Sequence, residues 1–71
     1  MSFSMSTLAA NIRAERARAD ISQEELAERA NVSAAAVLSY ESGTYVPGTD
    51  KLAAIAEALG CTPNDLLGWG N

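Results

Sequence analysis

The chain has 71 residues, no histidine, one cysteine and a net charge of −4 at pH 7. This length suits one domain, and the composition excludes an internal disulfide, a multi-cysteine metal site and histidine-based catalysis. No apolar run approaches the ~20 residues of a membrane helix, and the start lacks the basic region of a signal peptide, so we expect a cytoplasmic protein without membrane contact, cofactor, metal ion or enzymatic activity.

Two helices are expected in the first thirty residues. The first should span about 7–19, with Ser6 or Thr7 accepting hydrogen bonds at its start. The second should begin at Ser22, because Ser22 and Glu25 have the spacing of a capping box, in which the two ends bond each other reciprocally.

Two further helices are expected in the middle of the chain. Asn31 should end the second helix, because asparagine tolerates the left-handed backbone of a tight turn. Ser33 should cap a third helix over about 34–42, which Gly43 terminates. After a loop, Thr49 should cap the fourth helix.

A short fifth helix should open with Thr62, Pro63 and Asp65, which supply a cap, a proline at the first helical position and an acid in the first turn. No segment alternates with a period of two, so the sequence predicts an all-α fold, a compact domain of five helices. The domain is expected over 6–68, with flexible tails at 1–5 and 69–71.

The segment 22–42 has the requirements of two helices that cross steeply at a short turn. Ala27 is a small residue where the helices would touch, and Asn31 is suited to the turn. Leu26, Val32 and Val37 provide apolar side chains before, in and after it.

A longer pattern extends from about Leu8 to Leu67. It consists of Ser22-Gln23-x-x-Leu26-Ala27, Val32-Ser33-x-x-x-Val37, Glu41-x-Gly43, Pro47, Leu52-x-x-Ile55-Ala56-x-Ala58-Leu59-Gly60 and Asp65-Leu66-Leu67. In this order and at this spacing, the pattern resembles the lambda-repressor-like helix-turn-helix family of the Cro/C1 or Xre type. Asn31 stands where members of that family usually have glycine.

The resemblance implies a sequence-specific DNA-binding transcriptional regulator, a phage or bacterial repressor or Cro-like protein. It would bind double-stranded DNA as a homodimer, with one helix of each copy in the major groove. Gln23 would donate to a phosphate, and Arg16 and Glu41 would pair between the first and third helices. The remaining residues implied at the DNA are Ser33, Ala34, Ala35, Ser39, Thr44 and Tyr45.

The end of the chain suggests where two copies would meet. Leu66, Leu67 and Trp69 offer more apolar surface than a short tail easily hides, and such surface marks interfaces. We therefore expect these three residues at a dimer interface, although packing of Trp69 on the core of its own chain is an equally open alternative.

Two departures from the family leave a second function open. Ala34, Ala35 and Leu38 make the outer face of the third helix apolar, and the loop after Gly43 has no basic residue before Lys51. Both features reduce the expected hydrogen bonding to bases and attraction to phosphate. The alternative is a protein-interaction module on the same fold, an antirepressor or a regulator's partner with weak or lost DNA binding.

Overall fold

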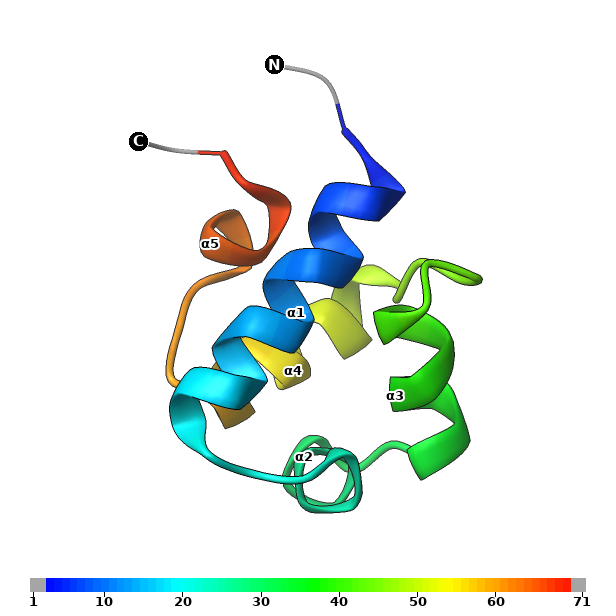
Figure 1. The fold of residues 1–71 in the computed structure, drawn as a ribbon, viewed down its shortest axis with the longest axis vertical. Coiled ribbons are helices and arrows are strands. Elements are labelled where there is room, and N and C mark those ends of the chain that lie inside the picture. The colour runs from blue at the N-terminus through cyan, green and yellow to red at the C-terminus, as the bar shows by residue number, and fades with distance from the viewer. Residues whose placement is uncertain (1–2, 70–71) are drawn as a thin grey trace.

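Five α-helices follow one another along residues 3–69, the part of the chain that the computed structural model describes (Figure 1). They are α1 (Met5–Ala19), α2 (Gln23–Ala30), α3 (Ala34–Glu41), α4 (Thr49–Leu59) and α5 (Pro63–Leu67). The predicted all-α class and the five-helix order are confirmed. Within the described range, no helix combines the length and apolar character needed to span a membrane.

Serine side chains begin α2 and α3 as the sequence predicted. The hydroxyl oxygen of Ser22 accepts from the Glu25 backbone N–H at 3.0 Å, and Ser33 accepts from Ala36 at 3.0 Å. The capping box at Ser22 forms only in this direction, because the Glu25 carboxylate instead accepts from Arg29 at 2.6 Å. This helical pair is four residues apart, a spacing that brings side chains together on one face.

The first and fourth helices begin differently from the prediction. Ser4, rather than Ser6 or Thr7, caps α1 by accepting from the Thr7 backbone N–H at 3.2 Å. Several residues near this end carry a hydroxyl group that could cap a helix. Because they are chemically alike, the sequence did not show which one does so. Thr49 was also wrongly predicted as a cap: it is already the first helical residue of α4, after Gly48, and α4 has no side-chain cap.

The fifth helix begins with a complete capping box. The Thr62 hydroxyl accepts from the Asp65 backbone N–H at 3.1 Å, and the Asp65 carboxylate accepts from the Thr62 backbone N–H at 2.9 Å. The hydrogen bond from the Thr62 backbone N–H lowers the pKa of Asp65, because it stabilises the charged carboxylate. Beyond the helix, the Trp69 backbone N–H donates to the Asn64 carbonyl at 3.0 Å.

Hydrogen-bonded structure is present slightly beyond 6–68, the range expected for the domain. Ser4 and Met5 belong to the start of α1, and Trp69 is bonded to the turn that ends α5. The flexible tails expected at 1–5 and 69–71 stay a prediction. Residues 1, 2, 70 and 71 of those expected tails lie outside the described range.

The core lies where all five helices meet. In Figure 1, α1 crosses the front with α5 and α3 on either side of it, and α4 lies behind. Helix α1 contacts α3, α4 and α5, whereas α2 contacts α3 and α4. The fully buried larger side chains are Ile12, Leu26, Val37, Ile55 and Leu66. Because each helix contributes one of them, burial of apolar surface holds α2 and α3 in a fixed relation to the rest.

Candidate nucleic-acid interface

The α2–α3 unit has the geometry that the sequence predicted. Asn31 adopts a left-handed backbone with φ of 57°, and the chain then turns so that the Val32 N–H donates to the Ala27 carbonyl at 2.9 Å. Ala27 is buried, which lets the helices approach closely, and Val37 anchors α3 in the core. The unit is therefore held from one side, and the opposite side of α3 stays free.

The free side of α3 is formed by one helical face. Ala34, Ala35, Leu38 and Ser42 are exposed, whereas Ser39 is half-buried. Positions separated by three, four and eight residues lie on the same side of a helix, so these side chains form a single ridge. Of the residues predicted at the groove, Ser33 is exposed at the start of this ridge and Ser39 lies at its margin.

The loop after α3 is folded back onto the end of that helix. The Ser39 carbonyl accepts from the backbone N–H groups of Thr44 at 3.0 Å and Tyr45 at 3.3 Å. The Ser42 hydroxyl donates to the same carbonyl at 3.1 Å and lies 2.8 Å from the Thr44 hydroxyl. Thr44 and Tyr45 therefore offer exposed side chains beside the ridge, while their backbone donors are already used.

The two residues expected to pair, Arg16 and Glu41, lie together between α1 and α3. The Arg16 Nε is 2.6 Å from one Glu41 carboxylate oxygen, and its second terminal nitrogen is 3.1 Å from the other. Arg16 also donates to the Ile21 carbonyl at 3.0 Å. Glu41 is only 3% exposed, and its hydrogen bond raises the pKa of Arg16 above the usual value. The pair thus locks α3 to α1.

Gln23 and Arg13 extend this network in ways that the sequence analysis missed. The Gln23 side-chain amide donates to Glu41 at 3.0 Å, and the Arg13 guanidinium donates to the Glu41 backbone carbonyl. Gln23 starts α2 as predicted, but it lies 18 residues from Glu41 in the chain. No local pattern signals such a contact, because it depends on how α2 and α3 pack.

Most basic side chains are occupied within the molecule. Arg29 pairs with Glu25 at 2.6 Å, and Arg18 pairs with Glu15 at 3.5 Å. Lys51 takes part in none of the ion pairs found among residues 3–69. The surface around α3 therefore offers hydroxyl, amide and hydrocarbon groups rather than a dense row of cations.

For one of the three residues expected at a dimer interface, the prediction is wrong. Leu66 is completely buried in the core of its own chain, so its side chain cannot contact a second copy. Leu67 is half-buried and packs against the same core, whereas Trp69 is exposed. Apolar character in the sequence could not distinguish these positions, because α5 turns one leucine inward and leaves the other at the edge.

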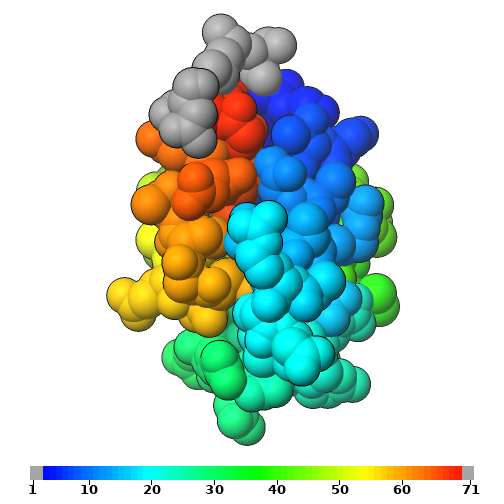
Figure 2. Space-filling model, turned by 60° about the vertical axis from the view of Figure 1, so that its left-hand side comes forward, coloured from blue at the N-terminus to red at the C-terminus, as the bar shows by residue number. Residues whose placement is uncertain are grey.

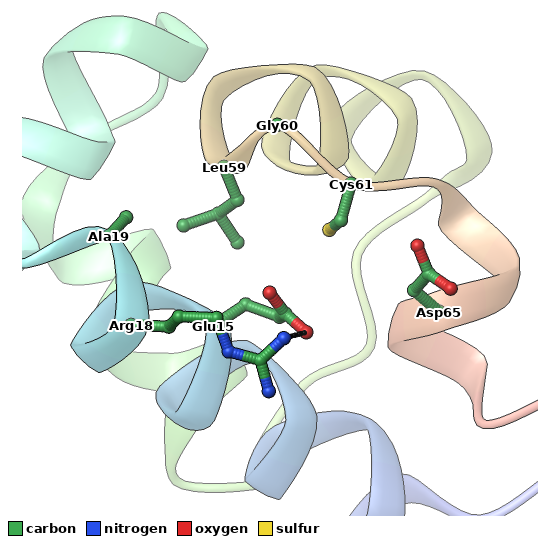
Figure 3. Close-up of a pocket in the computed structure, with 7 residues that line it drawn as sticks. All are labelled: Glu15, Arg18, Ala19, Leu59, Gly60, Cys61 and Asp65. Carbon is green, nitrogen blue, oxygen red and sulfur yellow. Dashed lines mark ion pairs between the residues drawn. The ribbon is translucent and has the colours of Figure 1, made fainter.

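A separate hollow of about 450 Å³ lies where α1 meets the α4–α5 junction, on the face seen in Figure 2. Figure 3 shows Arg18 paired with Glu15 on one side and Cys61 and Asp65 on the other. Burial raises the pKa of the Cys61 thiol, with Glu15 and Asp65 acting in the same direction, so the thiol stays protonated at neutral pH. No residue of α2 or α3 lines this hollow, which separates it from the ridge.

Comparison with known proteins identifies relatives of this fold. A family model described as helix-turn-helix matches residues 12–66. The DNA-binding domain of the P22 c2 repressor in solution is 31% identical, with a TM-score of 0.84 over 94% of this chain and 86% of that one. The same repressor in complex with a synthetic operator is 33% identical, with a TM-score of 0.81 over 84% and 91%.

A bacterial regulator shows the same similarity. The clp gene regulator ClgR from Corynebacterium glutamicum is 32% identical, with a TM-score of 0.84 over 89% of this chain and 81% of that one. No curated protein sequence matches significantly. The family match covers most of the chain, including both helices of the α2–α3 unit. The chain therefore belongs to the Cro/C1-type helix-turn-helix family of DNA-binding transcriptional regulators.

Proposed function

We propose that this chain is a cytoplasmic, sequence-specific regulator, a repressor or Cro-like protein, that places α3 in the major groove of double-stranded DNA. The observation that carries the proposal is the α2–α3 unit, in which the core anchors one side of α3 while Ala34, Ala35 and Leu38 remain exposed on the other. The major groove is wide enough to admit an α-helix. The P22 c2 repressor, to which this chain is similar, forms a complex with a synthetic operator, which supports DNA as the ligand.

Gln23 is the proposed backbone contact at the start of α2. Its amide has two donor hydrogens, and one of them bonds the Glu41 carboxylate at 3.0 Å. The second can donate to a phosphate, where the positive end of the α2 dipole also favours an anion. Glu41 would thus hold Gln23 in one orientation before DNA arrives.

The bases would be read by few hydrogen bonds. Ser33 already accepts from the Ala36 N–H, but its hydroxyl hydrogen is available to an acceptor on a base edge. Ser39 would supply the second hydroxyl, and Ala34 and Ala35 would contribute methyl contacts. Thr44 and Tyr45 would lie along the sugar-phosphate backbone. Phosphate contacts from neutral groups position a protein without reading sequence, whereas contacts to base edges select it.

Two copies are proposed to act together on DNA. A symmetric dimer would place two α3 helices in successive major grooves, about one helical turn apart. Trp69, with a smaller part played by Leu67, is the proposed contact between copies, because it is an exposed aromatic side chain at the end of the domain. Two copies would make twice as many contacts to DNA as one copy, whose own interface has few cations.

Selection of bound DNA from a random duplex pool, followed by fluorescence anisotropy on the selected site, tests the proposal. Gln23→Ala should weaken all sequences alike, whereas Ser39→Ala should relax the preference at one position. If two or three cations per subunit reach phosphate, log Kd should change with log salt with a slope of magnitude roughly 4 to 5 for a dimer. Undetectable binding at low salt to any member of the pool would contradict the proposal.

A protein-interaction module is the second candidate. It is favoured by one observation, the exposure of Leu38, Tyr45 and Val46, which together place three large apolar side chains on or beside α3. Exposed apolar patches often mark contacts with other proteins. Failure to bind DNA in the selection experiment, by a chain shown to be folded, would favour this function.

A further inference from the structure

Leu38 occupies the centre of the exposed ridge of α3. It is 56% exposed, more than any other large apolar side chain of the helices, and it lies between Ala34 and Ala35 on one side and Ser42 on the other. The two alanines precede it by four and three residues, so their methyl groups border its side chain. The middle of the ridge is therefore continuous hydrocarbon.

The polar groups near this hydrocarbon have limited capacity to form hydrogen bonds with bases. The Ser42 hydroxyl already donates to the Ser39 carbonyl, and the Ser33 hydroxyl oxygen already accepts from Ala36. Glu41 is the charged residue of α3, and it is buried in its pair with Arg16. The ridge consequently has none of the long amide or guanidinium groups that make two hydrogen bonds to one base.

Hydrocarbon in the major groove has one complementary group on the bases. Thymine carries a C5-methyl group there, whereas the edges of the other bases present hydrogen-bond donors and acceptors. A polar edge set against a leucine would lose its water without gaining a partner. An apolar side chain therefore favours a thymine methyl and also disfavours the alternatives.

We propose that Leu38 is the main specificity-determining residue of this protein and selects thymine through its C5-methyl group. The inference rests on the proposed function, since it requires α3 to enter the major groove. Leu38 is favoured over the neighbouring alanines because its side chain has three more carbons and is the most exposed large apolar side chain of the helices. The DNA site should therefore contain thymines whose C5-methyl groups, rather than whose hydrogen-bonding groups, are needed for tight binding.

Uracil provides a direct test, because it differs from thymine only by the missing methyl group. The full chain is used to select a duplex from a random pool, and each thymine of that duplex is then replaced singly by uracil. We expect the replacement to raise Kd about fourfold for each methyl that is buried on binding. Leu38→Ala, whose fold is checked by circular dichroism, should bind the thymine and uracil duplexes equally at those positions.

Met5→Ala is the matched control, because it removes an apolar side chain that is 40% exposed on α1, outside the ridge. It should keep the full uracil effect. Specific binding that ignores every uracil, or a uracil effect that survives in Leu38→Ala, would overturn the role of Leu38 while the DNA-binding function stands. A folded chain that binds no duplex would overturn both and would assign the ridge to a protein partner.

Discussion

At the scale of single residues, the carboxylate of Glu41 contributes both to the stability of the domain and to the orientation of a proposed DNA contact. Arg16 from α1 and Gln23 from α2 both donate to it, and Glu41 itself belongs to α3. A buried carboxylate without partners is strongly unfavourable, so each donor lowers the free energy of the folded state. One network thus fixes three helices and orients the proposed phosphate contact.

Arg16→Met is predicted to destabilise the domain. It removes two of the side-chain hydrogen bonds to Glu41 and leaves a buried carboxylate with Gln23 as its remaining side-chain donor. Because Arg16 is 23% exposed, water can partly replace it, and we expect a loss of about 2 kcal/mol. For a domain of this size the melting temperature should fall by roughly 8–16 °C, as measured by circular dichroism.

Arg18→Met is the control for this change, because Arg18 is 77% exposed and pairs with Glu15 only at 3.5 Å. A surface pair of this kind contributes little, so its melting temperature should change by a few degrees at most. The double variant Arg16→Met with Glu41→Leu should recover much of the lost stability, since it removes the unpaired charge as well. Equal effects of the two arginine variants would contradict the role assigned to the buried pair.

At the scale of the helices, hydrogen bonds between residues up to five apart mark where the elements begin and end. Asn31 ends α2 with φ of 57°, and its N–H donates to the Glu28 carbonyl at 3.2 Å. Most L residues avoid this left-handed region because the side chain approaches the following carbonyl, whereas glycine enters it without that cost. The angle between α2 and α3 therefore depends on the residue at this turn.

Asn31→Ala is predicted to lower the free energy of unfolding by about 1 kcal/mol, because alanine is strained at this backbone geometry. Asn31→Gly should remain within about 0.5 kcal/mol of the parent protein, since relief of strain is offset by the greater freedom of glycine in the unfolded chain. Urea denaturation measures both. Glu28→Ala, a change at an exposed position within α2, serves as the control. If Asn31→Ala were as stable as Glu28→Ala, alanine would not be strained at this turn.

At the scale of the whole molecule, the start of α1 and the segment just after α5 come together. The start of α1 and the segment after α5 lie at the same end of the molecule in Figure 1, and an added Cβ at Gly68 would lie only 3.1 Å from the Thr7 side chain. Asn11 ties the helices together by donating to the Leu66 carbonyl at 2.9 Å. This end carries exposed apolar side chains, namely Phe3, Met5 and Trp69.

Trp69→Ser is predicted to weaken self-association by about tenfold or more, because a central aromatic residue commonly dominates an interface. Sedimentation equilibrium over a range of protein concentrations measures the change. Tyr45→Ser is the control in free solution, since Tyr45 is an even more exposed aromatic residue, at 66%, but lies beside α3. A parent chain that remains monomeric at high concentration and binds a single half-site would contradict the dimer.

Features that depend on residues close together in the chain were easier to predict than those that depend on packing. The caps at Ser22, Ser33 and Thr62 could be predicted, because each accepts a hydrogen bond from an N–H three residues away. The start of α1 was misassigned even so, since several hydroxyl residues there compete for the same role. Spacing identifies the residues that could cap a helix. Which of them does so depends on whose hydroxyl oxygen lies next to a free backbone N–H group.

The sequence by itself determined the helix order, the turn at Asn31 and the family, because helix caps, turn residues and apolar periodicity act over a few neighbouring residues. Only the tertiary structure decided that Gln23 bonds Glu41 and that Leu66 is buried while Trp69 is exposed. These outcomes depend on which helix faces pack together, and packing joins residues far apart in the chain. Local chemistry therefore predicts the two helices and the turn of the proposed DNA interface. Which hydrogen-bond donors and apolar side chains are free at that interface follows from the packing.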